Sequence, residues 1–307
     1  MRTCESRRWR PAAPVDVAFS LSVHRRGRGD PAYRRTPDGA VWRAVRTPAG
    51  PGTLRVCAAP STAEVTAQAW GAGAQWLLDR LPAMLGADDD LAGFTPVHPP
   101  VRDAALRRSG FRVGRTERVL EALVPAILEQ KVTGMEAHRS WRELLRRFGT
   151  PAPGPAETVQ WMRVPPQPSA WVELPSWEWH RAGVDPRRAR TIRVAASAAN
   201  RLEETVALGG EVAARRLRSL PGVGQWTVAE VRQRAHGDAD AVSVGDLHVP
   251  GIIGWALAGE VVDDDGMLAL LEPYAGHRYR VQRLLETPGV GPPRRAPRFA
   301  PRDYRAL

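Results

Sequence analysis

The residues between 217 and 250 are the ones best suited to chemistry in this sequence. At 221–224 the letters PGVG predict a tight turn between a short helix and a second helix that starts at Gln225. The amides of Gly222 and Gly224 then lack a partner within either helix, and glycine lets another backbone approach closely. Amides at the start of a helix favour an anion, so a nucleic-acid phosphate fits this turn. A plain corner between two helices would use the same residues.

The same segment resembles a known family. The PGVG turn, followed by Thr227 and by the pair Gly245-Asp246, resembles the helix-hairpin-helix and catalytic loop of the HhH-GPD DNA glycosylases. Residues 127–130 resemble the family's other element on the lesion side, and motif similarity extends over residues 120–285. The strand-rich N-terminal region and the lack of a cysteine cluster are most similar to the inducible bacterial 3-methyladenine-DNA glycosylases.

The resemblance implies that Asp246 is the catalytic carboxylate. Such enzymes turn a nucleotide out of the duplex and break its glycosidic bond, and a carboxylate stabilises the oxocarbenium-like charge and helps water attack. The ordinary alternative is an N-cap for a helix over 247–255, and one residue can serve both purposes. Asp238 and Asp240 are expected to be structural and to end the second helix of the hairpin.

Trp226 and Lys131 bear on the type of glycosylase. Trp226 matches the position at which bifunctional members carry a lysine that forms a Schiff base with the sugar. Lys131 is the only lysine in the chain and lies on another element, so we expect hydrolysis without strand cleavage. Lys131 follows Gln130 where related enzymes often place an apolar wedge. It can contact the opposite strand or a phosphate, or both residues can simply be polar groups at a helix end.

Aromatic side chains are the natural partners of the expected substrate. An alkylated purine already carries positive charge, so it leaves without much acid help and can be held on aromatic faces. Candidates for these faces are Trp141, Trp226, Trp255 and Tyr274, although tryptophan at helical spacing more often belongs to a core. Leu284-Leu285, where some relatives have a pocket aromatic, leaves the substrate range open. We expect DNA contacts from Gly222, Val223, Gly224, Gln225, Thr227, Gln130 and Lys131.

Metal chemistry is not expected. Cys4 and Cys57 are the only cysteines, so one chain cannot build a disulfide framework or a four-cysteine zinc or iron–sulfur site. The histidines show no paired metal spacing, and no catalytic metal or cofactor is predicted. The resemblance implies one structural monovalent cation, Na⁺ or K⁺, at the backbone carbonyls of Arg218, Leu220 and Val223.

Composition is consistent with a DNA partner. The 307 residues have a net charge of +11 and a pI near 11.0, which favours a polyanion, although an arginine excess can also reflect a GC-rich genome. No run of 18 apolar residues occurs, so we expect a cytoplasmic protein, not a membrane protein. We expect a monomer that binds damaged double-stranded DNA. The alternatives are a non-catalytic hairpin DNA-binding protein, a superfamily glycosylase for another lesion, and a small-molecule enzyme.

Pattern along the chain predicts an α+β fold. Residues 1–100 are expected to form a small antiparallel sheet domain with a linker, 101–290 a helical glycosylase domain, and 291–307 a flexible basic tail. Residues 64–85 are ambiguous, and 149–175 are expected to be mostly loop. Strands are predicted at 15–23, 40–46 and 53–57 with a turn at 36–39, and helices at 117–130 with Thr116 as N-cap, 135–148, 186–202 and 211–218.

Overall fold

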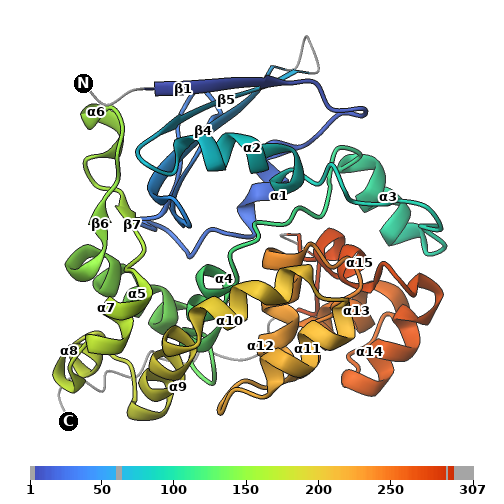
Figure 1. Ribbon diagram of the computed structural model, residues 1–307. Coiled ribbons are helices and arrows are strands. Elements are labelled where there is room, and N and C mark those ends of the chain that lie inside the picture. Colours follow the sequence, from blue (N-terminus) through green and yellow to red (C-terminus); the bar gives the residue numbers. More distant parts are fainter. Residues whose placement is uncertain (1–3, 60–63, 288–289, 294–307) are drawn as a thin grey trace.

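The computed structural model describes residues 4–59, 64–287 and 290–293 and combines one main sheet with many helices (Figure 1). The sheet is five-stranded and antiparallel, in the order β1-β5-β4-β3-β2. The expected α+β class is confirmed. The strands are β1 Cys4–Trp9, β2 Tyr33–Arg35, β3 Val41–Thr47, β4 Gly50–Ala59 and β5 Glu64–Trp70, and a separate pair is formed by β6 Thr150–Pro151 and β7 Arg163–Val164.

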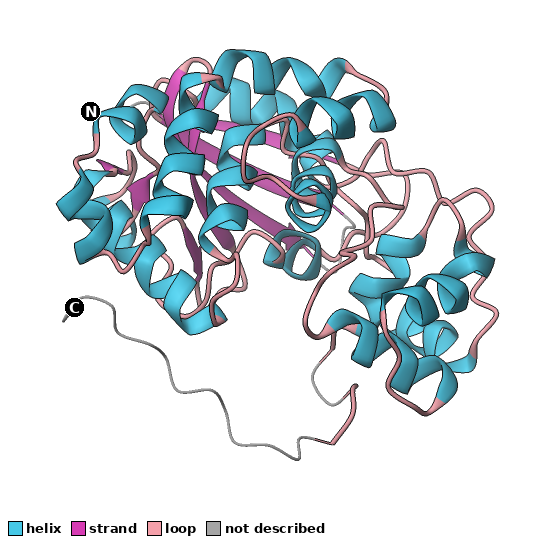
Figure 2. Cartoon of the chain, turned by 90° about the horizontal axis from the view of Figure 1, so that it is seen from below, coloured by secondary structure: helices cyan, strands magenta, loops and turns pink. Residues whose placement is uncertain are grey.

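Two large apolar cores lie among the helices. One core is shared by α4, α5 and the helices from α7 to α12, and the other by α3, α13, α14 and α15. Seen from below, helices cross in front of the sheet (Figure 2). No helix in the described ranges is long and apolar enough to cross a bilayer. The helices are α1 Val17–Ser22, α2 Ala74–Met84, α3 Pro99–Arg107, α4 Val119–Leu128, α5 Gly134–Phe148, α6 Ala156–Val159, α7 Pro168–Glu173, α8 Ser176–Arg181, α9 Pro186–Ser197, α10 Ala199–Glu203, α11 Gly210–Arg218, α12 Gln225–Val231, α13 Val249–Ala258, α14 Asp264–Leu271 and α15 Arg278–Leu285, with a π-helical turn at Arg232–His236 after α12.

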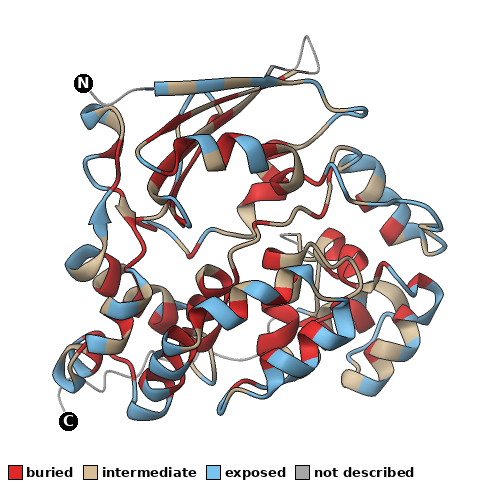
Figure 3. Cartoon of the chain, in the orientation of Figure 1, coloured by how far each residue is buried: buried red, intermediate tan, exposed pale blue. Residues whose placement is uncertain are grey.

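The main sheet is covered on both faces. Val41 and Val45 of β3 pack with α1 and α2 on one face, because alternate side chains of a strand point the same way. On the other face Trp42 stacks on Trp70 of β5, with ring centroids 5.3 Å apart, and residues 152–164 complete this core. The buried residues therefore follow the strands and the inner sides of the helices (Figure 3).

Two local predictions were wrong. Residues 15–23 were expected to be a strand but contain α1, because the Asp16 side chain accepts a hydrogen bond from the amide of Phe19 and caps a helix. Thr116 does not cap α4. The amides of Val119 and Leu120 instead donate to the Glu203 carboxylate of α10, at 2.8 and 3.2 Å. The cap comes from a distant residue, which local sequence does not reveal.

The ambiguous segments also resolve. Residues 64–85 hold both β5 and α2, separated by the Gly71 and Gly73 positions that disfavour a helix. The segment 149–175 is more structured than expected, with the short β6–β7 pair, α6 and α7. Residues 294–307, which make up most of the predicted basic tail, lie outside the described residues.

Candidate active site

The predicted hairpin forms between α11 and α12, which lie side by side in Figure 1. Gly222 has a φ of 86°, a conformation that strongly favours glycine. A Cβ added there would lie 2.3 Å from Oγ1 of Thr191 on α9, so the turn packs closely on that helix. Val223 is buried and its amide donates to the Leu220 carbonyl at 3.1 Å. The turn is thus fixed from within.

The outer part of the hairpin remains available to a ligand. Gly222, Gly224 and Gln225 are exposed, and a Cβ at Gly224 would meet no atom within 4 Å. No side chain caps α12 at Gly224. The first amides of α12 are therefore free to bind an anion, as the sequence suggested.

Asp246 lies where the loop after the hairpin meets α13. Its Oδ1 accepts the amides of His248 and Val249 at 2.7 and 3.1 Å, so the carboxylate does cap the start of α13. Its Oδ2 accepts a hydrogen bond from Nε1 of Trp226 at 2.9 Å. Asp246 is half-buried, so it is oriented on both oxygens and still accessible. Capping and a catalytic position are compatible here.

The loop that carries Asp246 is braced by polar contacts that sequence reasoning missed. Oγ of Ser243 donates to Oε1 of Glu230 at 2.9 Å and accepts from Gln233 and Gln282 at 2.9 and 3.1 Å. All four residues are buried. Glu230 follows Trp226 by four residues, so both lie on the same face of α12, and this spacing could have indicated that Glu230 points toward the loop. The network fixes Ser243, which lies three residues before Asp246 in the loop that carries the candidate carboxylate.

Asp238 and Asp240 are engaged elsewhere. Asp238 forms an ion pair with Arg232, and Asp240 forms one with Arg278 at 2.7 Å. These contacts fit the structural role expected for both, because each carboxylate already has a cationic partner.

Gln130 and Lys131 lie beside the hairpin. Nε2 of Gln130 donates to the Gly222 carbonyl at 3.0 Å and to Oγ1 of Thr227 at 2.8 Å. Lys131 is exposed and has a φ of 55°, which costs free energy in a residue with a Cβ. The turn that holds Gln130 is therefore strained at Lys131. Arg188 of α9 fixes this turn by donating to the Leu128 carbonyl at the end of α4.

Among the four aromatic candidates, Trp226 hydrogen-bonds to Asp246 and two others are buried in cores. Nε1 of Trp141 donates to Asp30 and that indole is only 4% exposed. The hydroxyl of Tyr274 lies 2.6 Å from the His98 ring in the core of α3, α13 and α15. The expected pocket role of Trp141 and Tyr274 is therefore not supported, because helical spacing placed both in cores. Trp255 is 39% exposed on α13.

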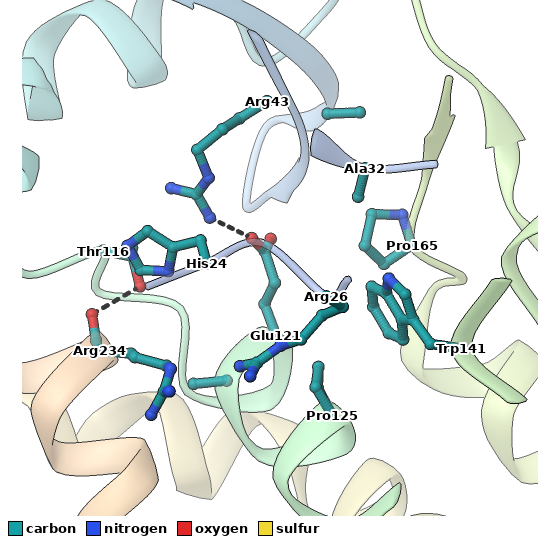
Figure 4. Close-up of a pocket in the computed structure, with 12 residues that line it drawn as sticks. His24, Arg26, Ala32, Arg43, Thr116, Glu121, Pro125, Trp141, Pro165 and Arg234 are labelled. Carbon is teal, nitrogen blue, oxygen red and sulfur yellow. Dashed lines mark hydrogen bonds and ion pairs between the residues drawn. The ribbon is translucent and has the colours of Figure 1, made fainter. Parts of the chain in front are cut away.

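Trp141 borders a cavity between the sheet and the helices (Figure 4). The cavity measures about 20 Å³, enough for one water molecule and far too small for a base. Across it Arg43 pairs with Glu121 at 2.8 Å, and Oε2 of Glu121 has no hydrogen-bond partner. Burial raises the pKa of Glu121 despite Arg43, and burial lowers the pKa of His24, which neighbouring arginines lower further. This cavity lies where the loop before β2 and strand β3 meet α4 and α5.

Comparison with known proteins supports the fold. No protein-family model matches the chain, and no curated protein matches it in sequence. A 3-methyladenine DNA-glycosylase from Archaeoglobus fulgidus is similar in structure, with a TM-score of 0.74 and 19% identity over 91% of this chain and 97% of that one. An 8-oxoguanine glycosylase/lyase from Clostridium acetobutylicum in its apo form gives a TM-score of 0.70 with 12% identity over 93% and 97%. The same enzyme in complex with double-stranded DNA gives a TM-score of 0.69 with 13% identity over 93% and 96%.

Proposed function

We propose that this chain, which has the fold of the HhH-GPD DNA glycosylases, hydrolyses the N-glycosidic bond of alkylated purines in duplex DNA. The contact between Trp226 and Asp246 carries the proposal. It places a carboxylate next to the first turn of α12, whose free amides can hold a phosphate. A carboxylate can stabilise the developing sugar charge, and a backbone site beside it can hold the DNA, so the pair supports base excision.

Asp246 is suited to stabilise a positive sugar. Two backbone amides and one indole hold its oxygens, so the carboxylate is oriented before substrate arrives. A preorganised negative group stabilises the charge that develops as the glycosidic bond breaks. It can also accept a hydrogen bond from the water that attacks the sugar, which is the second half of hydrolysis.

The contacts of Asp246 are compatible with a substrate that departs without protonation. Each of the groups that hydrogen-bond to this carboxylate is an indole or a backbone amide, and none is an acid that could protonate a departing base at neutral pH. An N-alkylated purine is already cationic and departs without such help. The absence of an amine at Trp226 favours hydrolysis without strand cleavage.

Two other functions make different predictions. A non-catalytic hairpin protein would bind DNA with salt sensitivity and release no base. A glycosylase for oxidised bases, like the Clostridium acetobutylicum enzyme, would release 8-oxoguanine instead of a methylated purine, and the structural similarity to that enzyme is what favours this alternative. The lesion assay separates these three cases.

The decisive experiment measures base release from duplexes that each contain one lesion: 3-methyladenine, 7-methylguanine, hypoxanthine or 8-oxoguanine. We expect release of the methylated purines, with strand breaks appearing only after alkali. Asp246→Asn keeps an oxygen for the amides of His248 and Val249 and should fold, but should release base at least about 100-fold more slowly. Wild-type rates in a folded Asp246→Asn protein would refute the mechanism.

We also propose a structural monovalent cation at the hairpin. Helix α11 ends at Arg218, and backbone carbonyls at the end of a helix suit Na⁺ or K⁺. The carbonyls of Arg215, Arg216 and Leu217 already accept hydrogen bonds from Ser219 and Leu220, so the proposed ligand from this helix end is the Arg218 carbonyl. The Leu220 carbonyl already accepts the amide of Val223, and oxygens can accept a second interaction. Among the described residues, no group of histidine, cysteine and acidic side chains could hold a metal ion instead.

A further inference from the structure

A second basic element, between α1 and β2, contacts the same turn that holds the hairpin. Residues 24–30, with the sequence HRRGRGD, connect α1 to β2 and are here called the basic loop. Arg25 and Arg28 in this loop are exposed, whereas Arg26 and Asp30 are buried. Arg25 and Arg28 are thus accessible to solvent, whereas Arg26 and Asp30 make contacts inside the protein.

The basic loop has a fixed shape. The Asp30 carboxylate accepts the amides of Arg26 and Ala32 at 2.7 and 2.9 Å and the indole Nε1 of Trp141 at 2.9 Å. Gly27 and Gly29 have φ values of 72° and 78°, which glycine adopts without strain. A side chain at position 27 could not be accommodated, because its Cβ would lie 2.5 Å from the ring of His138. The loop is therefore pressed against α5 and held there.

The same contacts place the loop next to the Gln130–Lys131 turn. Nη1 of Arg26 pairs with Oε1 of Glu129 at 3.1 Å, and Nε2 of His138 lies 3.7 Å from the same oxygen. Figure 4 shows Arg26 reaching from its loop toward α4. Glu129 directly precedes Gln130, which hydrogen-bonds the hairpin. The basic loop and the hairpin are thus attached to neighbouring residues of one turn.

The outward arginines are not neutralised. Neither Arg25 nor Arg28 forms an ion pair with a carboxylate in the part of the chain that the structure describes. Nε of Arg25 donates to the Gly27 carbonyl at 3.1 Å, which leaves its terminal nitrogens free for another acceptor. The one acid in the loop, Asp30, is occupied by its three donors. Two uncompensated guanidinium groups therefore stand on a rigid loop that is held by α5 and by Glu129.

We propose that the basic loop is a second contact with the DNA backbone, in which Arg25 and Arg28 bind phosphates beyond those held by the hairpin. The proposal rests on the proposed function and extends it to the sheet-bearing part of the chain. Arginine suits this task, because its planar donors match phosphate oxygens. A rigid loop also loses little conformational entropy on binding. The duplex would then span the hairpin, Lys131 and the basic loop.

The test compares two double variants with the same charge change. R25A/R28A removes the proposed contacts, and R102A/R107A removes two exposed arginines from α3 that also lack an ion pair among the described residues. Binding to an undamaged duplex is measured against salt concentration. We expect R25A/R28A to bind at least about tenfold more weakly at 0.1 M salt and to lower the salt slope by about 2, because each phosphate contact contributes about 0.9. R102A/R107A should stay within about threefold of wild type.

Each result has one meaning. Equal losses in the two double variants would show a mere effect of net charge and overturn the proposal. The same would follow if Gly224→Ala weakened binding while R25A/R28A did not, although the hairpin function would stand. A wild-type protein that binds no DNA would overturn the proposed function and this inference together.

Discussion

Nε1 of Trp226 donates a hydrogen bond to Oδ2 of Asp246 across 2.9 Å, and this contact joins the hairpin to the loop before α13. The two residues are half-buried and come from different elements. The carboxylate is thus oriented by the helix whose first amides face the expected phosphate. Positioning of the reactive group and of DNA are therefore coupled through one side chain.

Trp226→Phe tests this coupling. Phenylalanine keeps an aromatic face but cannot donate to Asp246, so base release should slow by about tenfold, the worth of one hydrogen bond of roughly 1.4 kcal/mol in the transition state. Single-turnover kinetics with saturating enzyme measures the effect. The matched control is Trp177→Phe on α8, an exposed tryptophan outside the hairpin and the Asp246 loop, which should react at the wild-type rate. Equal rates for all three proteins would show that the indole N–H is not needed.

The two hairpin glycines should respond differently to alanine. Gly222→Ala combines a positive φ with a Cβ 2.3 Å from Thr191, so the free energy of unfolding should fall by about 2 kcal/mol or more. Adding Thr191→Ala should restore part of this loss. Gly224→Ala meets no neighbouring atom and should unfold like wild type, yet bind DNA more weakly because the methyl group blocks a close phosphate. Denaturant unfolding and DNA titration together check the pair.

Lys131→Gly should separate stability from function. Glycine relieves the positive φ at this position, so the free energy of unfolding should rise by up to about 1 kcal/mol. DNA affinity should fall, because the only lysine of the turn is lost. Lys131→Arg, which keeps the charge and the strain, is the control. If the glycine variant bound DNA and released base like wild type, Lys131 would be a solvated charge at a helix end.

The contact between Arg26 and Glu129 predicts acid sensitivity. Burial acts to raise the pKa of Glu129, but Arg26 and His138 outweigh it and lower the pKa to about 2. Because the ordinary pKa is 4.5, this contact stabilises the fold fully above pH 4.5 and is lost as the pH falls toward 2. The free energy of unfolding of wild type should therefore drop by about 3 kcal/mol more than that of Glu129→Gln over this window. Parallel pH dependences in the two proteins would contradict the assignment.

Much of the site followed from local pattern. The hairpin turn requires glycine at position 222, and α13 requires a cap, which Asp246 supplies. Both requirements can be recognised from a few consecutive residues. Local sequence did not reveal which of the aromatic candidates are buried in a core. Trp141 and Tyr274 have the same amphipathic spacing as a pocket residue, and only packing showed that Asp30 and His98 take their polar atoms.

By itself the sequence determined the hairpin, the Gly-Asp pair, the α+β class and the lack of an amine at Trp226, because each depends on residue type or on contacts a few positions apart. The tertiary structure decided which distant groups meet. Glu203 caps α4, Ser243 holds the loop that leads to Asp246, and Arg26 joins the basic loop to Glu129. These contacts join residues far apart in the chain, and their formation depends on how the two apolar cores and the sheet pack, which no local pattern encodes.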